Sequence, residues 1–508
     1  MVARHPREKT LLATIFVLNA IEFLQAGMIA FGAGPIMGEI GASPEEFTLA
    51  TVVYAVVAIA AISKQGWLVE RLGWRGFIIS SVVVFVAGAA VCGASNEFHQ
   101  FLVGRAVMGM GGAAFMTSAR LLITLMPPGP RRFTGIKSFA SALAIGNALA
   151  SWLAAQSVAH DSWSAIFVIL AVAAIVAALL ATQCLPSSTV PLEQRSDAHP
   201  LAFLALLAGC ALSLYALQRA TYDFYGNALP LLATWALGAA AIAYFVRHQH
   251  GHPRPYLVLN RLRQPRYLTG LVLFTVCYLV LGANNYMLPA LTQRGLGFGW
   301  EVVGGVQGAG LVAALIVFWI MAQILPKYPS PKKFYVAGFL ALALCGALLS
   351  RLSGEADLWL HVMPAVAAYG AFIILVMATT AIQAFASLQQ DERAFAHGQQ
   401  LKNMLSQFGL AAGVAGAALG LQWRTGEHYA VLTGRFAHGD AVFDQALAQL
   451  STAFASSHGA QAPQVALGQL VRQLNQQSTL LASLDYFSFL VVFALVGAVA
   501  MMGQRVLK

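Results

Sequence analysis

The sequence predicts an all-α integral membrane protein with 14 transmembrane helices. Of its 508 residues, 58% are hydrophobic and only 10% are charged. A soluble domain usually carries about 25% charged residues, so this chain lacks the polar surface that a water-soluble protein of its size needs. The apolar residues also gather in long runs, and a run of about 20 apolar residues is what a helix needs to cross a bilayer.

The predicted helices follow one another along the whole chain. A basic start with Arg4, Arg7 and Lys9 is typical of a signal peptide, but the apolar run behind it is too long for one and further runs follow. We therefore expect it to remain as the first helix. The predicted spans cover residues 10–34, 46–65, 76–95, 99–125, 134–158, 163–184, 200–219, 229–247, 266–290, 302–325, 333–352, 359–388, 402–423 and 483–503.

The basic residues orient these helices. If the N-terminus is cytoplasmic, 22 of the 30 lysines and arginines, Lys402 among them, fall in cytoplasmic segments and six fall outside. Membrane proteins show this bias, and one helix more or fewer would reverse it for the rest of the chain. We expect a multi-pass protein of the bacterial inner (cytoplasmic) membrane with both termini cytoplasmic.

One extracytoplasmic loop, residues 424–482, is much longer than the others. Apolar residues at helical spacing in 441–457 and 463–482 predict two amphipathic helices before the last span. Such helices often lie at an interface, so a cap on the membrane or on its own domain is the simpler interpretation. The alternative is a docking surface for a periplasmic partner.

A single acidic residue lies well inside a predicted span. Glu22 is twelve residues past Thr10 in the first span, so it lies near the middle of the membrane. Asn19, Gln25 and Ala26 share its face of the helix. Ionisable groups at this depth are costly and usually functional, so this face is expected to point into the helix bundle or into a water-filled cavity.

Arg105 in the fourth span is the expected counterpart of Glu22. The pair has two interpretations: a static ion pair that fixes the helix register, or a carboxylate that binds a proton on one side and releases it on the other. In the second case Arg105 tunes the proton affinity of Glu22. Arg120, near the cytoplasmic end of the same span, is expected to extend to the interface.

The loop between the second and third spans carries a motif. Residues 66–75 read GWLVERLGWR and resemble the major facilitator signature G-x-x-x-D-R-x-G-R-R. Its matching positions are Gly66, Arg71, Gly73 and Arg75; Glu70 stands in place of aspartate, and Trp74 in place of a basic residue. In that family the motif forms a cytoplasmic gate, with the glycine allowing close helix contact.

Further positions extend the resemblance. Arg105 with Gly109 and Gly112 is similar to the family's fourth-helix pattern, and Gly146 and Asn147 lie in a small-residue stretch of the fifth span. These glycines are expected to permit close helix packing. The fourteen spans and the long loop before the last one resemble drug:proton antiporters of the EmrB/QacA type.

The resemblance implies a major facilitator fold. The six-helix halves would cover residues 10–185 and 266–503, two inserted helices would cover 200–247, and the extracytoplasmic loop would cover 424–482. It implies alternating access about a midplane site, no cofactor other than a proton gradient, and a possible periplasmic adaptor and outer-membrane channel. Polar residues within spans are substrate-cavity candidates, although hydrogen bonding between helices is an equal alternative: Asn19, Glu22, Gln25, Tyr54, Asn147, Asn284, Asn285, Gln307 and Gln383.

Other sites are not supported by the sequence. The five cysteines show no disulfide or metal spacing, and no P-loop is present. His248, His250 and His252 lack an accompanying acid or cysteine in the sequence, so an interfacial loop is preferred over a metal site. The distribution of basic residues is explained by topology and does not call for nucleic acid.

These observations predict a transporter and no enzyme. We expect a proton-coupled multidrug exporter of amphipathic, aromatic or cationic small molecules, an antiporter that could confer antibiotic resistance. One alternative is a dedicated exporter of a single metabolite, such as a siderophore or toxin. An importer, for instance of peptides, and a membrane enzyme or receptor are lower-ranked alternatives; the ExxER motif of peptide symporters is absent from the first helix.

Overall fold

A computed structural model of the protein describes residues 5–127, 130–160, 162–192, 195–197, 199–252, 255, 257–324, 330–434 and 441–507. Within these ranges, 14 segments are long and apolar enough to cross a membrane, which confirms the predicted number. The helices are α1 (His5–Phe31), α2 (Ala33–Glu39), α3 (Pro44–Ser63), α4 (Gln65–Gly93), α5 (Phe98–Gly112), α6 (Ala114–Leu122), α7 (Pro130–Ala159), α8 (Ala165–Cys184), α9 (Pro200–Gly251), α10 (Pro265–Pro289), α11 (Trp300–Ile324), α12 (Pro331–Leu349), α13 (Met363–Phe385), α14 (Glu392–Gly434), α15 (Ala441–His458) and α16 (Ala462–Gly503).

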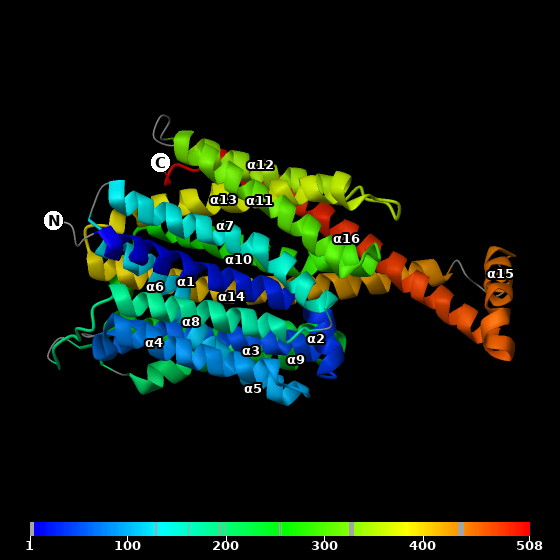
Figure 1. Cartoon of the computed structure of the whole chain (residues 1–508), viewed down its shortest axis with the longest axis horizontal. Helices are drawn as coiled ribbons and strands as arrows, with labels where there is room; N and C mark the ends of the chain where they lie inside the picture. The colour runs from blue at the N-terminus through cyan, green and yellow to red at the C-terminus, as the bar shows by residue number, and fades with distance from the viewer. Residues whose placement is uncertain are drawn as a thin grey trace.

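The helices form an elongated bundle with two distinct ends (Figure 1). Both chain termini lie at one end, which we call the termini end, and α15 lies beyond the other, the α15 end. Helices α1 and α3–α8 pack mainly on one another, as do α10–α14 and α16. We call these the first and second helix groups. They meet along α7 against α11 and along α3 against α14.

Helix α9 holds the seventh and eighth spans, Pro200–Asp223 and Gly226–Gly251. The non-helical backbone of Asn227 and the nearby Pro230 break it between them. The two parts then pack against each other, since a Cβ on Gly238 would lie 2.9 Å from the Gly209 carbonyl oxygen. As a unit, α9 packs on α3 of the first group and α14 of the second.

Two local contacts hold segments that connect the helices, one within α4 and one between the segments after α9 and before α14. Gly73 breaks α4 with φ of +68°, a conformation that favours glycine, and a Cβ there would lie 2.8 Å from the Ser188 carbonyl oxygen. After α9, Arg261 pairs with Asp391 at 2.6 Å, just before α14. The Ala394 N–H and this arginine stabilise the Asp391 carboxylate and hold its pKa below the ordinary value.

The long loop differs from the prediction in one respect. The first amphipathic helix is α15, but the second is not separate: residues 462–503 form one helix, α16, that includes the last span. No proline interrupts this stretch after its first turn, so the helix continues out of the bundle. Helix α14 also runs on to Gly434, and these extensions with α15 project from the bundle as an arm (Figure 1).

The base of the arm is held by a polar cluster between α14 and α16. Asp485 accepts hydrogen bonds from Arg424 Nε at 2.8 Å and lies 2.7 Å from His428 Nε2. Helix α15 itself contributes no buried residue and packs on α16. Helix α15 therefore does not form the expected cap on its own helix bundle, and whether it contacts the membrane surface stays a prediction.

Substitution of Gly111 by alanine is expected to destabilise the first helix group. A Cβ at this position would overlap the α4 backbone at Phe85 N and Ser81 O, and such overpacking typically costs about 1–3 kcal/mol. Gly416→Ala is the matched control, because a Cβ there meets nothing within 4 Å. We expect a lower midpoint of thermal unfolding in detergent for Gly111→Ala only; equal midpoints for the two variants would contradict this packing.

Candidate functional site

The centre of the bundle holds one buried carboxylate. Glu22 on α1 is 6% exposed, and among the described residues it is the only buried aspartate or glutamate. Gln407 on α14 donates a hydrogen bond to Glu22 Oε1 at 2.5 Å. The bond joins the two helix groups, so Glu22 lies at the contact between them.

Arg105 is also buried, but it does not pair with Glu22. Its Nη1 donates to Gln25 Oε1 at 3.4 Å, and its guanidinium lies over the Tyr54 ring, 4.2 Å from the centroid. Among the ion pairs of the described residues, none includes Glu22. The static ion pair suggested by the sequence is therefore not formed in this structure.

A large cavity lies on the α15 side of this centre. Its volume is about 440 Å³, and its lining includes Gln25, Tyr54, Arg105, Asn285 and Gln407. The Tyr54 hydroxyl and the Gln293 amide nitrogen, which also belong to the lining residues, have no hydrogen-bond partner in the described structure. Aromatic side chains complete the wall: Phe31, Phe47, Tyr286, Phe298 and Trp300.

A second cationic side chain, that of Lys402, is buried in the bundle. The sequence analysis had counted it with the cytoplasmic loops. Helix α14 begins at Glu392, ten residues before the predicted span, so Lys402 lies inside the bundle and is 6% exposed. Its Nζ donates to Asn403 Oδ1 at 2.7 Å and lies 3.5 Å from the Tyr278 hydroxyl.

Lys402 lines a smaller cavity of about 80 Å³ toward the termini end. Arg120 lines the same cavity and lies over the Phe139 ring, 5.8 Å from the centroid. The expectation that Arg120 extends away to the interface therefore does not describe its position. Three cationic side chains, those of Arg120, Lys137 and Lys402, are among the described lining residues, and no described aspartate or glutamate is.

The remaining polar candidates divide into two sets. Asn147, Asn284, Asn285 and Gln307 line a small cavity of about 30 Å³, where Ser151 donates to Gln307 Oε1 at 3.2 Å. Asn19 and Gln383 instead bond between helices. Asn19 donates to the Phe139 carbonyl at 2.7 Å, and Gln383 accepts from Arg266.

The glycines predicted for close packing lie at helix crossings. A Cβ would lie 2.8 Å from the Tyr54 carbonyl oxygen at Gly109, 2.7 Å from the Tyr54 hydroxyl at Gly112, and 2.9 Å from the Ala20 carbonyl oxygen at Gly146. Tyr54 is thereby fixed by the helix that carries Arg105. Gly66 differs, since a Cβ there would meet nothing within 4 Å, so it marks no close helix contact in this structure.

The signature loop binds the linker that follows α8. Glu70 Oε2 accepts hydrogen bonds from the backbone N–H and the hydroxyl of Ser196, both at 2.7 Å. Arg71 donates to the Ser196 carbonyl at 3.1 Å and lies 3.7 Å from Glu70. The Arg75 N–H donates to the Pro186 carbonyl at 3.3 Å.

Helix α14 supplies hydrogen bonds between the two groups at the termini end. Gln400 Nε2 donates to the carbonyls of Ile62 and Ser63 at 2.5 and 2.8 Å, and Asn403 donates to Thr117 Oγ1 at 2.5 Å. The sequence analysis missed these residues. Their signal was present: Gln400, Asn403 and Gln407 recur at helical spacing, but they had been divided between a loop and a span.

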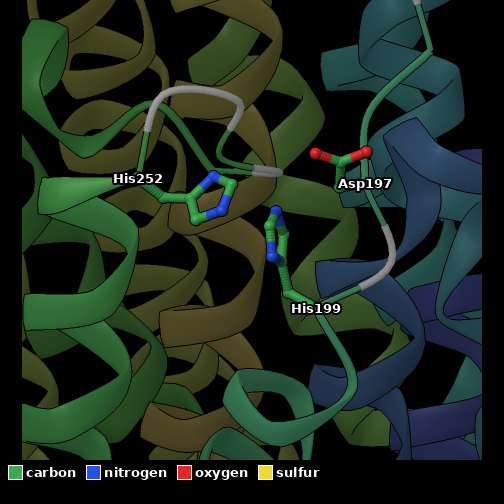
Figure 2. A group of neighbouring side chains, drawn as sticks. All are labelled: Asp197, His199 and His252. Carbon is green, nitrogen blue, oxygen red and sulfur yellow. The ribbon is translucent and has the colours of Figure 1, made fainter.

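The fold brings further potential metal ligands beside the histidines near the end of α9. Asp197 and His199, about fifty residues earlier in the chain, lie beside His252, with their ligand atoms all within 4.8 Å of one another (Figure 2). His250 is exposed and is not in this group. The interfacial loop was preferred because no acidic residue accompanies these histidines in the sequence. The fold brings one, Asp197, beside His252.

Comparisons with known proteins agree with the fold. The family profile of the Major Facilitator Superfamily matches residues 15–420. Proteins named multidrug resistance protein MdtD are 26% identical over 398 residues in Klebsiella pneumoniae and 25% identical over 396 residues in Salmonella typhi, in each case over 75% of this chain and 80% of the relative. The Escherichia coli protein of that name is 23% identical over 403 residues, 78% of this chain and 82% of its own.

Solved structures show the same architecture at low identity. A structure described as giving insights into substrate recognition in proton-dependent oligopeptide transporters has a TM-score of 0.60 at 15% identity, and a bacterial homologue of the lysosomal transporter Spinster has 0.58 at 13%; each match covers 98% of both chains. The nucleoside transporter NupG has 0.55 at 11%, over 98% of this chain and 100% of its own. The family profile spans most of the chain, and the relatives are named multidrug resistance proteins: the chain belongs to the major facilitator superfamily and is a membrane transporter, not an enzyme.

Proposed function

We propose that this transporter is a proton-coupled exporter of amphipathic aromatic molecules, an antiporter of the multidrug type. The observation that carries the proposal is Glu22, the only buried carboxylate of the described residues, bonded across the helix groups to Gln407. A carboxyl group in this position can carry one proton per cycle. The relatives' name, multidrug resistance protein, supports the substrate class.

In this mechanism Glu22 exchanges protons with alternate sides of the membrane. When Glu22 is ionised, it accepts the Gln407 hydrogen bond and offsets the charges of Arg105 and Lys402. Protonation removes that offset and weakens the bond between the groups, which favours rearrangement. Proton flow into the cell then drives the substrate outward through alternating access.

The large cavity suits a drug-sized aromatic substrate. Its volume of about 440 Å³ lies within the roughly 300–1,000 Å³ of small-molecule sites. Its wall combines aromatic rings with a few polar side chains that can hydrogen-bond a ligand, among them Gln25, Asn285 and Gln293. Charge favours neutral molecules over the cationic ones that the sequence analysis also expected, because the described lining residues include Arg105 and Arg294 and no aspartate or glutamate.

That charge also supports a second candidate, proton-coupled symport of an amphipathic anion. An anion held by Arg105 would stabilise the protonated form of Glu22, so the two would bind together. A substrate that competes with the proton does the opposite and releases it. The sign of proton exchange on ligand binding therefore separates export by antiport from symport.

The test measures proton exchange by the purified full-length protein in weakly buffered detergent. Matched aromatic ligands that differ only in charge are added: a neutral compound, a quaternary ammonium and a sulfonate. We expect the neutral compound to release protons and drive export from proteoliposomes with an imposed pH gradient. Proton uptake with the sulfonate and none released by the others would replace antiport with symport, and no exchange with any ligand would overturn proton coupling at this cavity.

We further propose that the protein lies in the bacterial inner membrane with the termini end in the cytoplasm. Support comes from the excess of lysine and arginine in the segments at that end. The arm of α14, α15 and α16 then projects into the periplasm, where a periplasmic adaptor leading to an outer-membrane channel could dock.

Removal of the arm is expected to leave export across the inner membrane intact and to impair export across both membranes. Replacing residues 430–475 by a short linker leaves the Arg424–Asp485 pair at the base intact. Transport in proteoliposomes should persist, while resistance of whole cells to a substrate should fall. Unchanged resistance in cells, with equal protein levels, would remove the adaptor from the proposal.

A further inference from the structure

The strongest unassigned cluster lies at the termini end, where the two spans of α9 begin and end. It joins Asp197 in the linker before α9, His199 at the N-terminal cap of α9 and His252 just after its last residue. Figure 2 shows the His199 ring between the other two side chains. We propose that these three residues bind a divalent transition-metal ion of the zinc type.

The donor set fits such an ion. Imidazole nitrogens with a carboxylate oxygen are ligands that zinc and its neighbours accept, whereas calcium and magnesium prefer oxygen alone. The three ligand atoms lie within 4.8 Å of one another, and in a tetrahedral zinc site they would be about 3.3 Å apart. The Asp197 side chain is exposed, so rotation about its side-chain bonds can close this gap.

A third histidine, His248, lies near these three residues. His248 lies one helical turn before His252, and its ring centroid is 5.4 Å from that of His199 and 5.5 Å from that of His252. The His199 and His252 centroids are 4.0 Å apart. The ligand atoms of His248 are not within 4.8 Å of those of the other three residues, so it would have to move toward them to become a fourth ligand.

The backbone at His199 supplies an independent observation. With φ of 40° and ψ of 63°, it is the only non-glycine residue with positive φ in the described chain. This conformation is costly for histidine, and a following proline, here Pro200, disfavours it further by steric restriction. Strain of this kind concentrates at functional sites, and here it sets the ring among the other ligands.

Binding at this site would act on the signature loop. Asp197 directly follows Ser196, whose backbone N–H and hydroxyl both bond Glu70 and whose carbonyl accepts from Arg71. A metal ion that ties Asp197 to α9 would hold this linker against the loop. The site would thus fasten the hairpin of α9 to the first helix group.

The test uses the full-length protein with an affinity tag that contains no histidine. Zinc binding is measured by calorimetry, and cobalt is used as a spectroscopic probe of a tetrahedral site. We expect one ion per chain, and a loss of affinity of about tenfold or more for His199→Ala and for His252→Ala, since even second-shell losses cost 10–100-fold. His250→Ala, one residue before the end of α9's last span and outside the cluster, is the matched control and should bind as the wild type does.

A second readout follows the linker itself. Zinc should slow hydrogen exchange of the segment from 186 to 197 in the wild type and in His250→Ala, but not in His199→Ala. Absence of zinc binding by the folded wild type would overturn the proposal. So would equal affinity of the wild type and a variant that lacks both His199 and His252. Neither outcome bears on transport, so the proposed export function is tested separately.

Discussion

Replacement of Glu22 by glutamine is expected to abolish proton exchange and uphill transport while leaving the protein folded. The amide oxygen can still accept a hydrogen bond from Gln407, but this bond is weaker than the one to an ionised carboxylate, as it is when Glu22 is protonated. What is lost is the only buried carboxylate of the described residues. Proton exchange should therefore fall from about one proton per bound ligand to none.

The folded state of this variant follows from the mechanism itself. Glutamine resembles protonated glutamate, a form that the transport cycle must visit, so the bundle must tolerate a neutral group beside Arg105 and Lys402. Ligand binding and exchange of substrate for substrate should persist, because the lining of the large cavity is unchanged. Gel filtration and thermal unfolding in detergent check the first expectation, and counterflow in proteoliposomes checks the second.

Glu355→Gln is the matched control for this experiment. It removes the same charge from an exposed residue in the loop between α12 and α13, and proton exchange should remain at the wild-type level. A Glu22→Gln protein that still concentrates substrate against its gradient at the expense of a pH gradient would show that the proton binds elsewhere.

The number of spans was predictable because hydrophobic runs in a bilayer are long and the basic residues between them alternate. Glu22 and Arg105 could be found for the same reason, since an ionisable residue stands out within an apolar run. The contacts that Glu22 and Arg105 make could not be predicted in this way. Reach along the helix axis suggested a pair, whereas the rotation of the helices places Arg105 over Tyr54 and Glu22 against Gln407.

The start of α14 was hidden because its buried face is polar. Residues such as Gln400, Lys402 and Asn403 are typical of a cytoplasmic loop when hydropathy alone is considered. In the structure they are buried between the helix groups, where their partners come from α3, α6 and α10. Long-range pairing of this kind leaves no local signal, and the same holds for Asp197 and His199 beside His252.

Loss of the α14 clamp at the termini end is expected to shift the conformational equilibrium toward opening at that end. Gln400 and Asn403 donate three buried hydrogen bonds from the second helix group to Ile62, Ser63 and Thr117 of the first. Each such bond contributes a net of about 0.5–1.5 kcal/mol. If all three break on opening, their loss in Gln400→Ala with Asn403→Ala favours the open form by roughly 2–4 kcal/mol, or about 30- to 1,000-fold.

Spin labels at Arg131 and Arg393 can follow this change, because both side chains are exposed and lie at the starts of α7 and α14, one in each helix group. The label-to-label distance should lengthen in the double variant. Gln399→Ala is the matched control: the residue is adjacent on the same helix, equally buried, and its amide nitrogen has no hydrogen-bond partner in the described structure. A distance distribution that is unchanged in the double variant, or that shifts as much in the control, would show that these bonds do not hold the termini end closed. Closure would then depend on apolar packing of α14 against α3 and α6.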